Sequence, residues 1–281
     1  MKKIIIFYFS GTGNTWWVSE RIVEALKELE VAASAHSIEQ VSVQDASAMI
    51  AEADTVGFGF PIYGSDVPRY FLRFLEALPP QANGKDTLGF VTQMAWSGDG
   101  FNFLRKMMDA KGYRVRWTAE FNMPNNVAIP FIPLPYSAEY ARFEKQLAKT
   151  QEKIARLCQV MVSGEEQREH ADPFSGASAW IQRGPFRWMH NWAGKLWSVD
   201  AEACTSCERC ARICPVDNIR MADGLPVHGD ACILCLRCFN YCPTLAIHYA
   251  GISNRRAEKN PPFKGPVKRF KPELICKQHE D

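Results

Sequence analysis

The chain has little of what marks membrane-spanning, secreted or nucleic-acid-binding proteins. Its 33 basic and 31 acidic side chains give a formal charge of only +2 over 281 residues, so the protein is not a polycation built for nucleic acid. The opening MKKIIIFYFS holds an apolar run of six residues, short for a signal peptide and far short of the roughly 20 residues of a membrane helix. We therefore expect a cytoplasmic protein without a transmembrane segment.

Two common nucleotide-binding loops and an evident catalytic set are also missing. In the stretch FYFSGTGNTWW, Trp16 stands where a dinucleotide fingerprint needs its third glycine, and the Gly-Lys-Ser/Thr ending of a P-loop is absent. The six histidines are scattered along the chain, and we interpret them as structural or exposed. No base or nucleophile set stands out, so the sequence predicts no catalytic residues.

Cysteine, in contrast, is concentrated in one region. Eight of the ten cysteines lie between residues 204 and 242, in two blocks related by a shift of 28 residues, and each block reads C-x2-C-x2-C-x3-C-P. In a reducing compartment such clusters are more often metal ligands or redox groups than disulfides. Bacterial ferredoxins hold two cubane clusters with this spacing, and the fourth cysteine of each run ligates the other cluster. Structural zinc, the alternative, usually takes two pairs of ligands, which triplets plus a single cysteine match poorly.

We accordingly predict two 4Fe-4S clusters with crossed fourth ligands. Three thiolates from one tight loop cover three corners of a cube, and the fourth must come from elsewhere. Cluster 1 is assigned to Cys204, Cys207, Cys210 and Cys242, and cluster 2 to Cys232, Cys235, Cys238 and Cys214. The remaining two, Cys158 and Cys276, are predicted not to be ligands.

Residues 1 to about 165 alternate short β-rich apolar runs with helical patterns, which is typical of a parallel sheet covered by helices. The predicted strands are Lys3–Phe9, Val31–Ile38, Thr55–Phe60, Thr87–Thr92 and Arg114–Phe121. Helical periodicity is clearest over Thr15–Leu29 and Ser137–Val162. We therefore expect an α/β domain with a doubly wound parallel five-stranded sheet.

The loop between the first strand and the first helix is rich in hydroxyl groups. It comprises Ser10, Gly11, Thr12, Gly13, Asn14 and Thr15. Its backbone N–H groups and the helix dipole form an anion site, and such a loop binds a terminal monophosphate through neutral hydrogen bonds. An ordinary glycine-rich turn is the alternative. The motif SGTGNT after an apolar strand resembles the FMN phosphate loop of flavodoxins, which implies FMN as a cofactor.

Two further segments follow predicted strands three and four, where flavodoxins bring loops around the isoalloxazine ring. The first supplies Pro61, Ile62, Tyr63 and Gly64, and the second supplies Thr92, Met94, Trp96, Gly98, Asp99 and Gly100. The resemblance implies that backbone groups near Gly64 meet the redox-active edge of the flavin. Tyr63 and Trp96 are candidates to stack on the ring, although either could be a packing aromatic. Ligands of open α/β sheets also bind at the carboxyl ends of strands beside the switch point.

Composition divides the chain into four parts. We expect a flavodoxin-like FMN-binding domain at 1–165, an aromatic-rich linker at 166–198, a small α+β two-cluster ferredoxin-like domain at 199–251 and a basic, Pro-rich tail at 252–281. The linker holds four of the eight tryptophans. We interpret it as a helix packing Trp188, Trp192 and Leu196 on the two domains; an apolar lid over the flavin or a membrane-surface contact are alternatives. The tail is expected to be a solvated extension wrapping the chain, or a docking site for an acidic ferredoxin.

As a whole, the chain resembles the flavodoxin-ferredoxin fusion proteins of anaerobic bacteria and archaea, the EFR-type ferredoxins. The resemblance implies an iron-sulfur flavoprotein that transfers electrons between two 4Fe-4S clusters and FMN. A cluster moves one electron at a time, whereas FMN holds one or two, so the pairing would couple one-electron and two-electron carriers. The expected partner is a redox protein, a ferredoxin or a reductase. Alternatively, the protein is a reductase whose small organic acceptor docks over the flavin.

Overall fold

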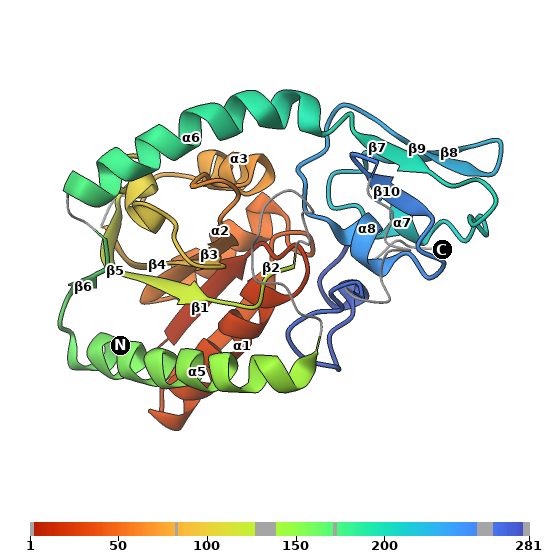
Figure 1. Cartoon of the computed structure of the whole chain (residues 1–281). Coiled ribbons are helices and arrows are strands. Elements are labelled where there is room, and N and C mark those ends of the chain that lie inside the picture. Colours follow the sequence, from red (N-terminus) through yellow and green to blue (C-terminus); the bar gives the residue numbers. More distant parts are fainter. Residues whose placement is uncertain (1–2, 82–83, 127–138, 171–172, 252–260, 278–281) are drawn as a thin grey trace.

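The computed structural model describes residues 3–81, 84–126, 139–170, 173–251 and 261–277. An all-parallel six-stranded sheet forms its N-terminal part (Figure 1). In space the strands follow one another as β2 (Ala32–Ser37), β1 (Lys3–Tyr8), β3 (Thr55–Pro61), β4 (Lys85–Gln93), β5 (Tyr113–Asn122) and β6 (Gln167–Arg168). The chain changes direction across the sheet between β1 and β3, and open α/β sheets bind their ligands beside such a switch point.

The predicted doubly wound parallel sheet is confirmed. Each of the five expected strands is present, with ends that differ from the prediction by at most two residues. The sixth strand, β6, was not expected. It consists of only two polar residues, which pair with Trp117 and Thr118 of β5, and a pair of polar residues carries no strand pattern.

Helices cover both faces of this sheet (Figure 1). One face packs against α1 (Asn14–Glu28) and α5 (Tyr140–Ser163), and the other against α2 (Val43–Glu52), α3 (Arg69–Ala77) and α4 (Arg105–Ala110), which follows a 3-10 turn at Gly100–Leu104. Because side chains alternate between the faces of a strand, Ile4 and Ile6 of β1 enter the first core, whereas Ile5 and Phe7 enter the second. The first two residues of the predicted helix Ser137–Val162 lie outside the described residues.

The cysteine-rich part contains two short antiparallel pairs of strands and two short helices. The pairs are β7 (Trp197–Val199) with β10 (Ile247–Tyr249) and β8 (Ile219–Ala222) with β9 (Leu225–His228); the helices are α7 (Arg209–Arg212) and α8 (Arg237–Tyr241). The 28-residue shift of the sequence repeat also relates the starts of α7 and α8. Its own apolar core is small, with three buried members, Ile219, Cys238 and Ile247. This agrees with the predicted small α+β domain.

The cysteine-rich part packs directly on the α/β part. Ile213 and Tyr241 belong to the core around α1 and α5, and Ile233 and Cys235 belong to the core on the opposite face of the sheet. Both cores therefore continue from one part into the other.

Most of the predicted linker is one long helix, α6 (Pro173–Ala193), which runs across the top of the molecule in Figure 1 from beside β5 to the cysteine-rich part. Small or polar residues form its buried side: Ser175, Ala179 and Arg183. Its large apolar side chains are exposed by 65 to 77% at Phe174, Trp180, Ile181 and Trp188.

The predicted packing of Trp188 on the two domains is therefore wrong, and Leu196 is only half-buried. The physical reason is that the surface beneath α6 carries Asp66 and Asp99, whose carboxylates bind arginines of the helix. The side chain of Trp192 lies outside the described part of the chain. Within the described residues, no helix is both long and apolar enough to cross a membrane.

The described end of the chain, residues 261–277, packs against α1, the end of β2 and α8, and it is not solvated throughout. Phe263, Phe270 and Ile275 are at most 3% exposed. The ring of Phe270 lies 5.1 Å from that of Trp16, and the Ser37 hydroxyl donates to the carbonyl of Ile275 at 2.7 Å. A solvated extension was expected, because the composition of this stretch is dominated by prolines and basic residues rather than by the few apolar side chains that anchor it.

Candidate functional site: two cysteine-lined cavities and a phosphate loop

Two small cavities lie among the repeated cysteines. The first is lined by Cys204, Cys207, Cys210 and Cys242. The second is lined by Cys232, Cys235, Cys238 and Cys214. Each cavity thus has three cysteines of one run and the last cysteine of the other run, which is the grouping expected for crossed ligation.

The donor set also bears on the kind of metal site. Each cavity offers three thiols of one run and one of the other, which fits the ligation of a 4Fe-4S cluster. Structural zinc usually takes two pairs of ligands instead.

Backbone amides donate to several of the sulfurs. The N–H groups of Asn218 and Ala246 each lie 3.3 Å from the sulfur four residues before them, Cys214 and Cys242 respectively. The indole N–H of Trp197 lies 3.3 Å from the sulfur of Cys232. Hydrogen bonds to the sulfurs are among the factors that set the potential of an iron-sulfur cluster.

The two cavities differ in how deeply they lie. Cys207 of the first cavity is exposed, whereas Cys235 and Cys238 of the second are each 9% exposed. Burial raises the pKa of the Cys210 thiol to about 11 and that of the Cys238 thiol well above its ordinary value. The first site therefore reaches the surface, and the second is interior.

The phosphate loop of residues 10–15 is closed by a hydrogen bond from the N–H of Gly13 to the Ser10 hydroxyl at 3.1 Å. Gly13 has φ 103° and directly precedes α1, whose first turn contains no acidic residue and has no side-chain cap. The buried Asn14 Oδ1 has no hydrogen-bond partner among the described residues. The Asn14 Nδ2 donates to the carbonyl of Pro124 at 2.9 Å. The uncapped start of this 15-residue helix fits a bound phosphate, because its first backbone N–H groups have no side-chain acceptor.

Two more hydroxyls of the loop are held by neighbouring strand ends. Thr15 Oγ1 lies 2.8 Å from Thr92 Oγ1, at the end of β4. Asn126 Nδ2 donates to Thr12 Oγ1 at 2.8 Å. Thr92 was predicted to belong to the loop after the fourth strand, around the flavin ring. Its side chain instead contacts the phosphate loop.

The loop after β3 turns tightly toward the cysteine-rich part. Gly64 and Ser65 both have positive φ, 61° and 58°, and the hydroxyl of Tyr63 is buried without a partner among the described residues. A Cβ at Gly11 would lie 2.6 Å from that hydroxyl and 2.9 Å from the carbonyl oxygen of Cys235. Burial raises the pKa of Tyr63 well above its ordinary value. The hydroxyl of Tyr63 and the carbonyl of Cys235 therefore both lie beside Gly11 of the phosphate loop.

The loop after β4 carries Trp96 toward the opposite edge of the sheet. Trp96 is 43% exposed, and its ring lies 5.3 Å from that of His170. His170 Nδ1 is 3.0 Å from Oε1 of the buried Glu120. Of the two predicted stacking aromatics, Trp96 thus lies at the surface, whereas Tyr63 is partly buried with a buried hydroxyl.

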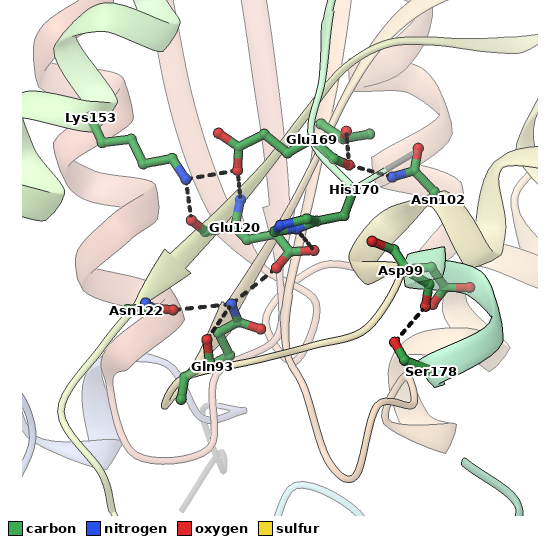
Figure 2. Close-up of polar contacts among 12 residues, drawn as sticks. Gln93, Asp99, Asn102, Glu120, Asn122, Lys153, Glu169, His170 and Ser178 are labelled. Carbon is green, nitrogen blue, oxygen red and sulfur yellow. Dashed lines mark hydrogen bonds and ion pairs between the residues drawn. The ribbon is translucent and has the colours of Figure 1, made fainter. Parts of the chain in front are cut away.

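Figure 2 shows the polar cluster around Glu120, at the carboxyl ends of β4 and β5. Gln93 Nε2 donates to Glu120 Oε2 at 3.0 Å, and Lys153 donates to the carbonyl of Glu120 and to the carboxylate of Glu169, each at 2.7 Å. The pairing of His170 with Glu120 was not predicted from the sequence, in which the histidines are scattered. The available signal was the position of Glu120 and Gln93 at the ends of adjacent parallel strands.

Helix α6 binds both loops that were predicted to surround the flavin ring. Arg183 Nε donates to the carbonyl of Ser65 at 2.8 Å, and Arg183 Nη2 lies 2.6 Å from Asp99 Oδ1. Its guanidinium lies 3.8 Å from the ring centre of Phe103. A Cβ at Gly98, which has φ 80°, would come within 2.5 Å of Ala179. The helix therefore meets these loops with a polar and small-residue side, and the described contacts do not form an apolar lid.

We expect Arg183→Met to weaken this contact strongly. The substitution leaves the largely buried Asp99 carboxylate and the Ser65 carbonyl without their partner, at a cost of about 2–3 kcal/mol. Arg187→Met is the matched control, because Arg187 also binds an aspartate, Asp66, but its side chain is 52% exposed; it should cost less than about 1 kcal/mol. Thermal unfolding and protease cleavage within α6 measure the difference. Equal losses of stability in both variants would contradict the inference that Arg183 holds α6 to the two loops.

The fold and these sites define an α/β flavin-binding domain joined to an iron-sulfur domain. Family models agree: residues 5–122 match the flavodoxin domain, and residues 197–220 and 225–248 match the 4Fe-4S binding domain. The chain is a flavodoxin-ferredoxin fusion, and it is an iron-sulfur flavoprotein of electron transport.

Matches among solved structures were also found. A flavodoxin from the domain Archaea is 18% identical, covering 56% of this chain and 96% of its own, with a TM-score of 0.39. The flavodoxin of Megasphaera elsdenii is 28% identical over 44% of this chain and 90% of its own, with a TM-score of 0.38. Rubredoxin oxygen:oxidoreductase from Desulfovibrio gigas is 18% identical over 58% of this chain and 37% of its own, with a TM-score of 0.40. A comparison with curated proteins gave no match.

Proposed function

We propose that this protein relays electrons between two 4Fe-4S clusters and FMN in the cytoplasm of an anaerobic organism, with a ferredoxin or a reductase as its partner. The clusters exchange single electrons and FMN holds one or two, so the combination couples one-electron to two-electron carriers. The observation that carries the proposal is the contact between the two sites. The carbonyl of Cys235, in the second cysteine run, and the hydroxyl of Tyr63 both lie against Gly11 of the phosphate loop.

The burial of the cysteines gives the relay an order. The second cavity, with Cys235 and Cys238, is interior and adjoins the phosphate loop. The first cavity reaches the surface at Cys207. Electrons are therefore exchanged with a protein partner at the first site and with the flavin at the second.

Each set of residues has a separate part in this proposal. The loop from Ser10 to Thr15 would hold the FMN phosphate on the N-terminus of α1. The turn at Gly64 and the loop from Met94 to Gly100 would lie along the ring, and Arg183 of α6 binds both loops. The crossed cysteine sets would hold the clusters, with Trp197 and backbone amides donating to their sulfurs.

One observation favours the second candidate, a reductase acting on a small organic molecule. An open cavity of about 470 Å³ lies beside the second ring loop, between β5 and α5. Its lining includes Met94, Glu120, Asn122, Lys149 and Lys153. It would admit a small polar acceptor, and Lys145 and Lys149 in its lining would favour an anion.

The two candidates are separated by one anaerobic experiment on the reconstituted full chain. Iron, sulfide and flavin are counted, the protein is reduced, and reoxidation is followed with a protein acceptor or with small organic anions. The relay predicts about eight irons and one FMN per chain and reoxidation by the protein acceptor. About four irons, or no FMN, would contradict it. Rapid reoxidation by a small molecule without any protein partner would favour the reductase.

A further inference from the structure

Arg237 is a fully buried cation of the second cysteine run. It stands between Cys235 and Cys238 at the start of α8 and is 0% exposed. Its guanidinium pairs with the buried carboxylate of Glu39, after β2. It also donates to the carbonyl of Ile213 at 3.2 Å. A side chain of the second cysteine run therefore reaches deep into the contact with the α/β part.

The same guanidinium holds the first two peptides of the phosphate loop. Arg237 Nη2 donates to the carbonyl of Ser10 at 2.6 Å, and Arg237 Nε donates to the carbonyl of Gly11 at 2.8 Å. A trans peptide is planar, so its N–H points opposite to its C=O. The N–H groups of Gly11 and Thr12 consequently point away from Arg237. Backbone N–H groups that point into such a loop are the donors that bind a phosphate.

The cysteine motif that would bind a cluster does not by itself require an arginine that bonds to the phosphate loop. The 28-residue repeat makes Arg209 the counterpart of Arg237 in the first run. Arg209 instead pairs with Glu273 near the surface, where the side chains are 32% and 52% exposed. The second run therefore carries an arginine at the phosphate loop, and the first run carries the same residue type elsewhere.

We propose that Arg237 is a positioning residue for the flavin phosphate, supplied to the phosphate loop by the iron-sulfur part of the chain. It fixes the carbonyls of Ser10 and Gly11 on its own side and so presents the two following N–H groups to the phosphate. Glu39 balances its charge, so the site binds phosphate through oriented backbone groups rather than through a free cation. This inference rests on the proposed FMN site.

The test compares two flavins that differ only in the phosphate. Flavin-free protein with its iron-sulfur part loaded is titrated with FMN and with riboflavin, and binding is followed by flavin fluorescence. Arg237→Lys keeps a cation for Glu39 but loses the planar fork that reaches two carbonyls. Arg237→Met combined with Glu39→Gln removes both charges together, which avoids a stranded buried carboxylate. Arg209→Lys is the matched control.

We expect the Kd for FMN to rise about tenfold in both Arg237 variants, whereas the Kd for riboflavin stays within about twofold. The phosphorus NMR signal of bound FMN should also move toward that of free FMN. Arg209→Lys should change neither affinity. An unchanged FMN affinity, an equal loss for both flavins, or the same loss in Arg209→Lys would overturn the inference. Wild-type protein that binds neither flavin would instead contradict the proposed function itself.

Discussion

Cys242→Ala is expected to remove the cluster assigned to the first cysteine run, although Cys242 lies in the second run. Its side chain lines the cavity formed by Cys204, Cys207 and Cys210, so that cluster would lose its fourth thiolate. Iron content should fall from about eight to about four per chain. The EPR spectrum of the reduced protein identifies which cluster remains.

Two reference variants make this result decisive. With crossed ligation, the spectrum of Cys242→Ala should match that of Cys207→Ala and differ from that of Cys235→Ala. The reverse match would contradict the crossed assignment. Cys158→Ser is the control, because Cys158 is buried in α5 away from both cavities and should retain all the iron.

Gly13→Ala should destabilise the protein and release the flavin. Gly13 has φ 103°, and a Cβ there would lie 2.8 Å from the ring of Phe270. An alanine therefore adds backbone strain of about 1–2 kcal/mol, and it must also displace a ring that is 3% exposed. We expect a total cost of about 2–4 kcal/mol and loss of bound FMN on gel filtration, because the strained residue is part of the phosphate loop.

Gly164→Ala is the control that adds backbone strain without a contact between the new Cβ and another side chain. Gly164 has φ 81° and ends α5, but a Cβ there would meet nothing within 4 Å. It should cost only the strain, about 1–2 kcal/mol, and keep the flavin. Equal shifts of the thermal midpoint in the two variants, with FMN retained in both, would show that the contact with Phe270 does not matter.

The features predicted well from the sequence depend on local patterns. Strands that alternate with helices are typical of a parallel sheet. The ends of the first five strands, from β1 to β5, were predicted to within two residues. The cysteine spacing repeats after 28 residues, and Cys214 lines the cavity of the second run; crossed ligation of the clusters stays a prediction.

The features that were missed depend on contacts between distant segments. Arg237 is one residue in a cysteine motif, and nothing local indicates that it binds Ser10 and Gly11, more than 220 residues earlier. Phe270 lies in a basic, proline-rich stretch whose composition suggests exposure. Contacts of this kind are fixed by how the two parts dock, and no periodicity records that docking.

The aromatic helix illustrates a different difficulty. Trp188 was expected to pack on the two domains, yet it is 70% exposed, and Trp180 is 77% exposed. The residues that α6 buries include Ala179 and Arg183, because Gly98 approaches the helix closely and the carboxylate of Asp99 lies beneath it. The complementary surface decides which side of a helix is buried.

Electrons are proposed to pass between the iron-sulfur part and FMN within one chain. Anaerobic rapid mixing of the protein with a one-electron donor tests this transfer, with flavin absorbance followed in the wild type and in Cys235→Ala, whose interior cluster site adjoins the phosphate loop. Bound FMN should be reduced rapidly in the wild type, and most of this rate should be lost in Cys235→Ala. Equal rates of FMN reduction in the two proteins, with flavin fully bound in both, would contradict it.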